Sequence, residues 1–330
     1  MKKKLMGLLC VVLAAATLGG CAKEDSTKIT LNEVAHSIFY APQYVAIENG
    51  YFKDEGIDLE LVTGFGADKV LTALISGEAQ IGFMGGEASI YAYLEGNKDV
   101  VMNFAQLTQR AGNFLVARDE EPDFKWSDLK GKEVLGGRKG GMPEMVFEYI
   151  LKQNGISPEK DLSIDQSIDF GSTAAAFSGG QGDYTVEFEP SATLLEQEGQ
   201  GKVVASLGED SGYVPYTSYC AQKSYMKKHP EIIQSFTNAL QRGMDYVQNH
   251  TAKEIATIIA PQFPEQNLET LTTIVTRYQD QDTWKANLIY EEESFTLLQD
   301  ILESAGELSN RVPYSTLVTT AYAQEAATPN

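Results

Sequence analysis

Cysteine and histidine are scarce in this chain of 330 residues, and each shortage excludes a kind of chemistry. The three cysteines are Cys10, Cys21 and Cys220, and the three histidines are His36, His229 and His250. The histidines lie far apart and lack the paired spacing that a zinc site or a histidine-based catalytic group needs. We therefore expect no metal site, no cofactor and no catalytic residues.

Basic residues are also few, because 26 Lys and Arg stand against 46 Asp and Glu, which gives a formal net charge of -20 at pH 7. Nucleic acids and anionic lipid head groups attract proteins through basic patches that release counterions, and this composition offers none. We expect a monomer that binds no nucleic acid, with an acidic surface that keeps it in solution.

The N-terminus has the pattern of a bacterial lipoprotein signal. Three lysines at 2–4 precede an apolar run over 5–18 that is short for a membrane span, and Leu18-Gly19-Gly20-Cys21 follows. The pattern predicts a signal peptide over residues 1–20 and lipidation of Cys21, which places the protein outside the cytoplasm, anchored to the cell membrane. Cys220 is then the one cysteine of the folded part, and its apolar neighbours indicate a buried, inert thiol.

The rest of the chain is long enough for two domains of about 100 to 200 residues each. Between residues 28 and 104, strand-like and helix-like segments alternate, which predicts a mostly parallel sheet with helices on its faces. The alternation restarts near Phe114 and reaches about Leu207, and only helical periods follow Tyr219. The apolar stripes of these late helices favour a return to the first sheet.

Several blocks of the sequence resemble one family of proteins. Residues 40–46 (YAPQYVA) and 48–60 (ENGYFKDEGIDLE) look like the opening of the thiamine-precursor and nitrate/sulfonate/taurine group of ABC-transporter substrate-binding proteins. Residues 71–82, 128–132 and 187–190 are similar to later parts of the same group. The first two blocks are the specific ones, and the resemblance covers roughly Ile29 to Leu302.

The resemblance implies an α/β protein with the two-lobed, periplasmic-binding-protein-like (type II) fold, whose ligand binds in the cleft between the lobes. The first lobe is expected to combine 21–111 with 223–312, including C-terminal helices, and the second to span 112–222. The two crossovers are expected near Thr108 to Asn113 and near Tyr219 to Ser224. Residues 313–330 lack a sustained period and are expected to be a weakly ordered tail.

Ligands of open α/β sheets bind beyond the carboxyl ends of the strands, which selects particular loops of both lobes. Glycines that precede helices can present free N–H groups, carboxylates can accept from amines, and arginines can grip anions. The expected ligand-binding residues are His36, Phe39, Tyr40, Gly66, Gly86, Glu87, Arg110, Arg138, Gly140, Gly141, Met142, Glu187 and Glu189.

Structural roles remain open for most of these residues. The glycines also suit plain turns, and Glu87 can complement a helix dipole instead of binding ligand. Phe39 and Tyr40 can stack on a flat ring or fill the core of a lobe. His36 can cap a loop, and Arg138 can be a solvated side chain.

The resemblance implies a protein that captures a small nutrient and passes it to the membrane subunits of an ABC permease without chemistry. The carboxylates and aromatics in the loops favour a nitrogenous heterocycle such as a thiamine pyrimidine precursor, and an alkylsulfonate, taurine or another small anion is the alternative. A pyrimidine-synthesising enzyme of the same fold is less expected, because its cysteine-rich motif has no counterpart here. An adhesin or signalling lipoprotein would instead show an exposed apolar patch.

Overall fold

The computed structural model describes residues 26–168 and 170–328. The expected signal peptide and Cys21 lie outside these residues. Within the described ranges, no helix combines the length and apolar character needed to cross a membrane.

The first sheet has the order β2-β1-β3-β10-β4. Its strands are β1 Thr27–Glu33, β2 Ile57–Thr63, β3 Ile81–Met84, β4 Val101–Thr108 and β10 Thr217–Gln222. β1 runs parallel to β2 and β3, whereas β10 is antiparallel to β3 and β4. Every residue of β3 and β4 is buried, as expected for strands that are covered on both faces.

The second sheet has the order β7-β6-β8-β5-β9. Its strands are β5 Asn113–Ala117, β6 Glu133–Leu135, β7 Ser163–Asp165, β8 Tyr184–Phe188 and β9 Lys202–Ser206. β6 is parallel to β7 and β8, and β5 is antiparallel to β8 and β9. The alternation of strands and helices read from the sequence therefore produces two separate sheets.

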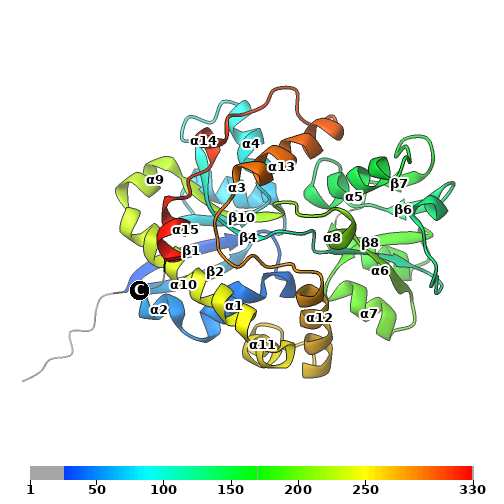
Figure 1. Ribbon diagram of the computed structural model, residues 1–330, viewed down its shortest axis with the longest axis horizontal. Coiled ribbons are helices and arrows are strands. Elements are labelled where there is room, and N and C mark those ends of the chain that lie inside the picture. Colours follow the sequence, from blue (N-terminus) through cyan, green and yellow to red (C-terminus); the bar gives the residue numbers. More distant parts are fainter. Residues whose placement is uncertain (1–25, 169, 329–330) are drawn as a thin grey trace, which may run out of the picture.

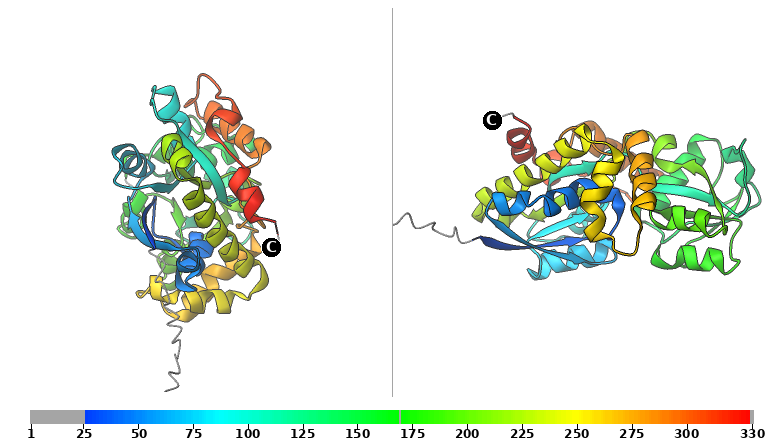
Figure 2. Two further views of the ribbon diagram at one scale, coloured as in Figure 1. Left: turned by 90° about the vertical axis from the view of Figure 1, so that its left-hand side faces the viewer. Right: turned by 90° about the horizontal axis from the view of Figure 1, so that it is seen from below.

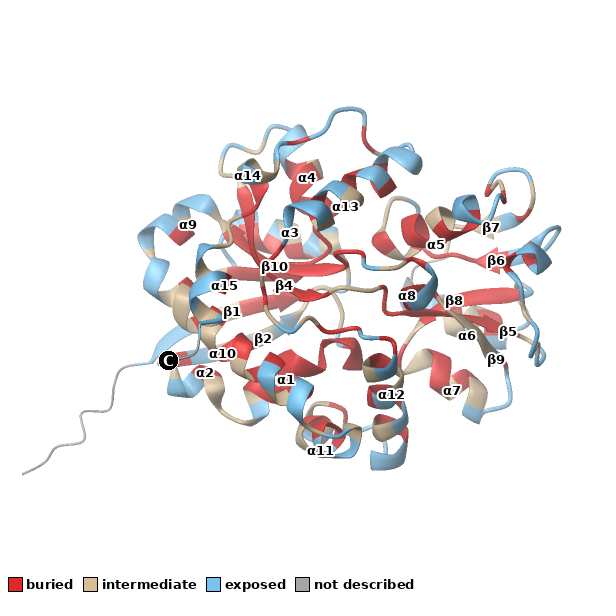
Figure 3. Cartoon of the chain, viewed as in Figure 1, coloured by how far each residue is buried: buried red, intermediate tan, exposed pale blue. Residues whose placement is uncertain are grey.

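Each sheet is the core of one lobe, and the lobes lie side by side (Figures 1 and 2), with the buried residues concentrated on the strands and the inner helix faces (Figure 3). The helices of the first lobe are α1 Ala41–Glu48, α2 Tyr51–Asp54, α3 Ala67–Ser76, α4 Glu87–Leu94, α9 Lys223–Lys228, α10 Pro230–Asn249, α11 Ala252–Ile259, α12 Leu268–Asp280, α13 Glu292–Ser304, α14 Tyr314–Leu317 and α15 Ala321–Ala326. Those of the second lobe are α5 Met142–Gln153, α6 Thr173–Ser178, α7 Ser191–Gln197 and α8 Leu207–Asp210. Short 3-10 turns are η1 Ile38–Tyr40, η2 Trp126–Leu129, η3 Phe170–Ser172 and η4 Ala260–Gln262.

The chain crosses between the lobes twice. The first crossing, at 109–112 between β4 and β5, lies where the sequence predicted it. The second lies at 211–216, so the expected position near Tyr219 to Ser224, and with it the end of the second lobe at 222, was wrong. The cause is β10, whose residues Thr217 to Ala221 are buried because the strand inserts between β3 and β4 of the first sheet.

Residues 313–328 form ordered structure, contrary to the weakly ordered tail expected over 313–330, of which 329–330 lie outside the described residues. α14 and α15 are too short to show a helical period in the sequence, but they bury Leu317, Val318 and Ala323. Val318 forms a parallel bridge with Asn103 of β4, and the Thr319 N–H donates to the Asn103 carbonyl at 3.0 Å. The segment thus covers the edge strand of the first sheet.

We expect Leu317→Ala to lower the free energy of unfolding by about 2 to 5 kcal/mol, because it removes a fully buried side chain from the segment that covers β4. The matched control is Ser315→Ala on the same helix, at an exposed position, which should change it by less than about 0.5 kcal/mol. Denaturant unfolding checks both variants. Equal stability of the two would mean that α14 does not contribute to the core.

Candidate functional site

A pocket of about 140 Å³ lies between the lobes. It is formed where the loop after β1 faces the turn after β8, as expected for the carboxyl ends of strands in α/β sheets. Its lining residues are Ala35, His36, Ser37 and Tyr40 from the first lobe and Gly171, Ala174, Glu187, Phe188, Glu189, Pro190 and Ser191 from the second. Of the predicted site residues, the structure brings His36, Tyr40, Glu187 and Glu189 together here.

His36 is held in the pocket wall by both ring nitrogens. Nδ1 lies 2.8 Å from Oε1 of Glu33, and Nε2 lies 2.8 Å from the carbonyl oxygen of Gln262. The hydrogen bond to the Glu33 carboxylate raises the pKa of His36, and burial opposes it. Since a carbonyl and a carboxylate both accept, this arrangement suits a protonated imidazole that donates from both nitrogens.

Glu33, at the end of β1, holds the first-lobe wall of the pocket in place through hydrogen bonds. Its carboxylate is fully buried and also accepts from Gln43 at 2.7 Å, from the Tyr44 hydroxyl at 2.9 Å and from Thr63 at 3.1 Å. Such a satisfied network fixes its members in place. Glu33 was missed by the sequence analysis, although an acidic residue that ends an apolar strand was a usable signal.

Tyr40 and Phe39 are neighbours with different surroundings. Tyr40 lines the pocket, and within the part of the chain that the structure describes no residue hydrogen-bonds to its hydroxyl. Phe39 lies in the core, with ring centroids 5.7 Å from Phe188 and 5.6 Å from Tyr216. Tyr40 is therefore available to a ligand, whereas Phe39 packs between the lobes.

Glu187 and Glu189 enter the pocket wall from the second lobe. Glu187 is 2% exposed and accepts from the Thr185 hydroxyl at 2.6 Å; burial raises its pKa to about 7, while hydrogen bonds from Thr185 and Thr173 oppose that rise. The Glu189 carboxylate accepts from the Thr193 N–H at 2.9 Å and pairs with Arg277 at 2.8 Å. Glu187 is thus the freer of the two carboxyl groups.

Glu87, the first residue of α4, is a buried carboxyl group near the lobe interface. It is 4% exposed, its Oε2 has no hydrogen-bond partner among the described residues, and burial raises its pKa to about 7. Burial, then the charge of Glu33 and then that of Glu87 raise the pKa of Tyr40, so the Glu87 carboxyl group acts electrostatically on a residue of the pocket lining. A buried polar atom without a partner is rare in proteins and marks a place to look for a ligand.

The glycine pair before Glu87 makes room for polar side chains. A Cβ on Gly85 would lie 2.0 Å from Oε2 of Glu87, and one on Gly86 would lie 2.9 Å from the Tyr290 hydroxyl. That hydroxyl is also buried without a partner among the residues described. The requirement for glycine at 85 and 86 therefore comes from the Glu87 carboxyl and Tyr290, and no local pattern in the sequence pointed to Tyr290.

The remaining predicted residues lie away from the pocket lining. Arg110 donates to the Gly208 carbonyl at 3.0 Å and stacks 4.2 Å over the Tyr213 ring, so it braces the two crossovers. Arg138 is exposed, and Met142 is buried at the start of α5. Gly66 and Gly141 precede α3 and α5, while the Gly140 N–H donates to the Glu144 carboxylate at 3.1 Å.

Groups typical of metal or thiol chemistry are not gathered here. Across residues 26–168 and 170–328, no cluster of three His, Cys, Asp or Glu side chains could hold a metal ion. Cys220 is fully buried on β10, and burial raises the pKa of its thiol. The prediction that Cys220 is buried is confirmed, and a raised pKa disfavours the reactive thiolate form.

Comparison with known proteins identifies the family. The NMT1/THI5 like family matches residues 38–254. A protein of Bacillus subtilis (strain 168) named as a binding protein, YtlA, is 44% identical over 316 residues, which cover 95% of each chain. The 4-amino-5-hydroxymethyl-2-methylpyrimidine phosphate synthase of Aspergillus parasiticus is 23% identical over 235 residues, 68% of this chain and 67% of that protein.

Solved structures share the fold at low sequence identity. The alkanesulfonate-binding protein SsuA from Xanthomonas axonopodis pv. citri, bound to MOPS, superposes with a TM-score of 0.73 at 15% identity and covers 90% of this chain and 99% of its own. The periplasmic nitrate-binding protein NrtA from Synechocystis PCC 6803 gives 0.71 at 15% identity, covering 92% of this chain and 89% of its own. The chain belongs to the NMT1/THI5 like family and has the expected two-lobed, periplasmic-binding-protein-like fold.

Proposed function

We propose that this protein is the extracytoplasmic solute-binding component of an ABC importer, and that it captures a small nitrogenous heterocycle by closing its lobes. The observation that carries the ligand class is the buried Glu87 carboxyl group, whose Oε2 has no partner among the described residues. An amine or ring N–H of a ligand would supply the missing hydrogen bond. Support for the binding role comes from the family and from YtlA.

The pocket between the lobes offers groups of its own that suit such a ligand. Glu187 presents a second buried carboxyl group, and Tyr40 has a hydroxyl without a hydrogen-bond partner in the described ranges and a ring that can stack on a flat heterocycle. The distant synthase relative is named for a substituted aminopyrimidine, which has both a flat ring and an amine. We infer that this chain binds such a molecule without transforming it.

A small anion is the second candidate, favoured by the His36 imidazole in the pocket wall and by the sulfonate-binding and nitrate-binding relatives in fold. Two observations weigh against it. Arg110 does not line the pocket and its guanidinium contacts Gly208 and Tyr213, and the guanidinium of Arg138 is exposed. The carboxyl groups of Glu87 and Glu187 would repel a buried anion in their ionised forms.

The proposal includes a membrane location. After removal of residues 1–20, a lipidated Cys21 would tether the protein to the outer face of the cell membrane, where a permease could receive the ligand. We infer a monomer that exchanges ligand with the membrane subunits of that permease.

A ligand panel tests the proposed class. We expect 4-amino-5-hydroxymethyl-2-methylpyrimidine to raise the melting temperature of the purified protein, and taurine, ethanesulfonate and nitrate to leave it unchanged, because only a ligand bound by the folded state stabilises it. Isothermal titration calorimetry then gives the affinity. If a sulfonate or nitrate binds and the pyrimidine does not, the proposed ligand class is a small anion and not a heterocycle.

Glu87→Gln separates ligand binding from stability. We expect the pyrimidine to bind more than tenfold more weakly, because the amide cannot supply a carboxylate acceptor. In wild type, folding raises the pKa of Glu87 from 4.5 to about 7, so the ligand-free folded state holds one more proton than the unfolded state between these values. Stability therefore falls as pH rises through that window, by roughly 3 kcal/mol, and the variant should escape this loss.

The matched control is Glu95→Gln, an exposed residue that ends the same helix. Thermal melts at pH 5 and pH 8 without ligand should give wild type and the control the same pH dependence, and a smaller loss at pH 8 for Glu87→Gln. If Glu87→Gln instead lowers stability at both pH values and keeps ligand affinity, Glu87 serves the α4 dipole and not the ligand.

Cys21→Ala tests the anchor. In cells grown with labelled palmitate, the wild-type protein should carry label and stay with the membrane fraction, whereas Cys21→Ala should lose both. Cys10→Ala, in the same leader, is the control and should behave like wild type. Retention of label by Cys21→Ala would contradict the lipidation site.

A further inference from the structure

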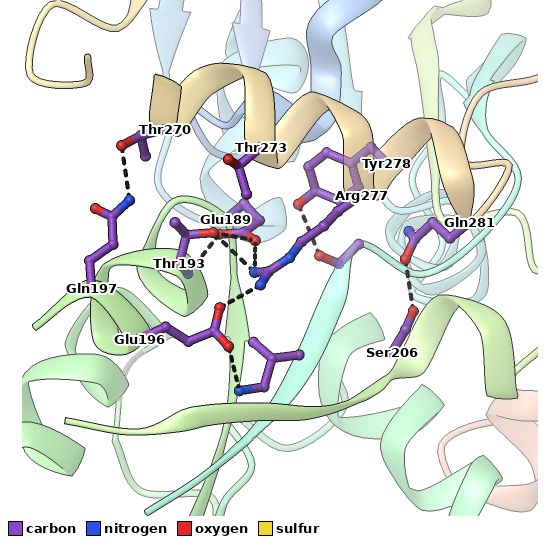
Figure 4. A network of polar contacts seen from close by, with 12 residues as sticks. Glu189, Thr193, Glu196, Gln197, Ser206, Thr270, Thr273, Arg277, Tyr278 and Gln281 are labelled. Atoms are coloured by element: carbon purple, nitrogen blue, oxygen red, sulfur yellow. Dashed lines mark hydrogen bonds and ion pairs between the residues drawn. The ribbon is translucent and has the colours of Figure 1, made fainter. Parts of the chain in front are cut away.

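Helix α12 belongs to the first lobe, and several of its side chains make polar contacts with the second lobe or with the first crossover (Figure 4). At its C-terminal end, the Tyr278 hydroxyl donates to the Gly112 carbonyl at 3.0 Å, and Gln281 donates to the Ala111 carbonyl at 3.1 Å. These bonds attach α12 to the first crossover. A helix fixed there can control how the second lobe sits against the first.

Arg277 of α12 provides the main link to the second lobe. Its guanidinium donates to Oε1 of Glu189 at 2.8 Å and to the Thr193 hydroxyl at 3.0 Å, and it forms an ion pair with Glu196. Two neutral hydrogen bonds flank it: Gln197 donates to Thr270 at 3.0 Å, and Ser206 donates to Gln281 at 2.7 Å. A planar guanidinium that bridges two carboxylates fixes orientation as well as distance.

Glu189 joins this link to the pocket. Its side chain is 1% exposed and pairs with Arg277, while its main-chain carbonyl accepts from the Ser37 hydroxyl of the first lobe at 2.9 Å. Both Ser37 and Glu189 line the pocket. Because an unpaired buried carboxylate is strongly unfavourable, the observed position of this wall depends on Arg277.

A second polar contact region between the lobes, where α5 lies against α13 and its flanks, has weaker interactions. Lys152 donates to the Ser304 carbonyl at 2.5 Å, Tyr91 contacts the Gly140 carbonyl at 3.5 Å, and Lys139 lies 3.9 Å from Glu307. Exposed lysine contacts of this kind contribute little to orientation. The pair of the half-buried Arg277 and the buried Glu189 is the stronger constraint.

We propose that Arg277 is a positioning residue for ligand capture, which sets the angle between the lobes by holding the Glu189–Glu196 segment against α12. The inference rests on the proposed role in solute capture, because a ligand that binds between the lobes requires a particular angle between them. It does not depend on which ligand binds. Without Arg277, α12 keeps the neutral hydrogen bonds Gln197–Thr270 and Ser206–Gln281 to the second lobe but loses the ion pairs, and the Glu189 carboxylate loses its charged partner.

Small-angle X-ray scattering of the ligand-free protein tests the proposal. We expect Arg277→Gln to increase the radius of gyration and broaden the distance distribution relative to wild type. Arg277→Lys keeps the charge but cannot bridge both carboxylates, so its radius of gyration should lie between those of wild type and Arg277→Gln. Unchanged scattering for Arg277→Gln in a folded protein would overturn the proposal.

The matched control is Arg242→Gln. Arg242 pairs with Asp54 at 2.8 Å and stacks 4.0 Å over Tyr51, so it makes a similar set of contacts entirely within the first lobe. Its scattering should equal that of wild type, and an equal expansion of both variants would also overturn the proposal. If Arg277→Gln does not fold, Glu196→Gln is measured instead. A larger radius of gyration than that of wild type supports the role of Arg277 in holding the lobes, and an unchanged radius of gyration refutes it.

These measurements use no ligand, so they are independent of the ligand panel. Failure of the pyrimidine to bind would leave the scattering result standing, and unchanged scattering would leave the ligand class standing. With any panel compound that binds, Arg277→Gln should also raise the dissociation constant, because the competent lobe arrangement is less populated.

Discussion

The pairing of β10 with β3 and β4 is the contact on which the architecture depends. A strand that returns from the second lobe and inserts into the middle of the first sheet cannot leave without opening two ladders of hydrogen bonds. The insertion forces the chain to cross twice between the lobes, at 109–112 and 211–216. Two adjacent crossings leave the loops after β1 and β8 facing each other across a gap, which is where the pocket forms.

Two acidic groups, Glu187 in the pocket lining and Glu87 near the lobe interface, are buried from water, and their burial has a cost in stability. Glu87 and Glu187 both have pKa values raised to about 7 by burial. A fold selected only for stability would replace such groups with apolar side chains of similar size. Buried polar groups that reduce stability are common at binding sites, because the ligand supplies the missing hydrogen-bond partner.

Much of this arrangement could be read from the sequence, because the periods of strands and helices are local. The two α/β units and the loops with His36, Tyr40, Glu187 and Glu189 follow from such patterns together with the rule on strand ends. The first crossing was expected from the resemblance of the sequence to ABC-transporter substrate-binding proteins. β10 was not predicted as a strand: a crossover was expected near Tyr219 to Ser224, because the short segment Thr217–Gln222 has no strong strand pattern of its own. Its partner strands are far away in the sequence.

Long-range pairing explains the other differences. Arg277 lies on a polar face of α12 that looks solvated in the sequence, and its partners Glu189 and Glu196 are separated from it by most of a lobe. Phe39 and Tyr40 are adjacent aromatic residues, and only the tertiary structure decides that the first fills the core while the second faces the pocket.

The C-terminal segment has a consequence for behaviour at high local concentration. Open sheet edges present unpaired N–H and C=O groups that recruit strands from other chains. On one side of the first sheet, 317–319 cap β4 through Asn103. On the other, β2 carries Asp58 and Glu60 at exposed positions, and charges of this kind discourage pairing between copies. Molecules crowded on a surface are thereby protected from edge-to-edge aggregation.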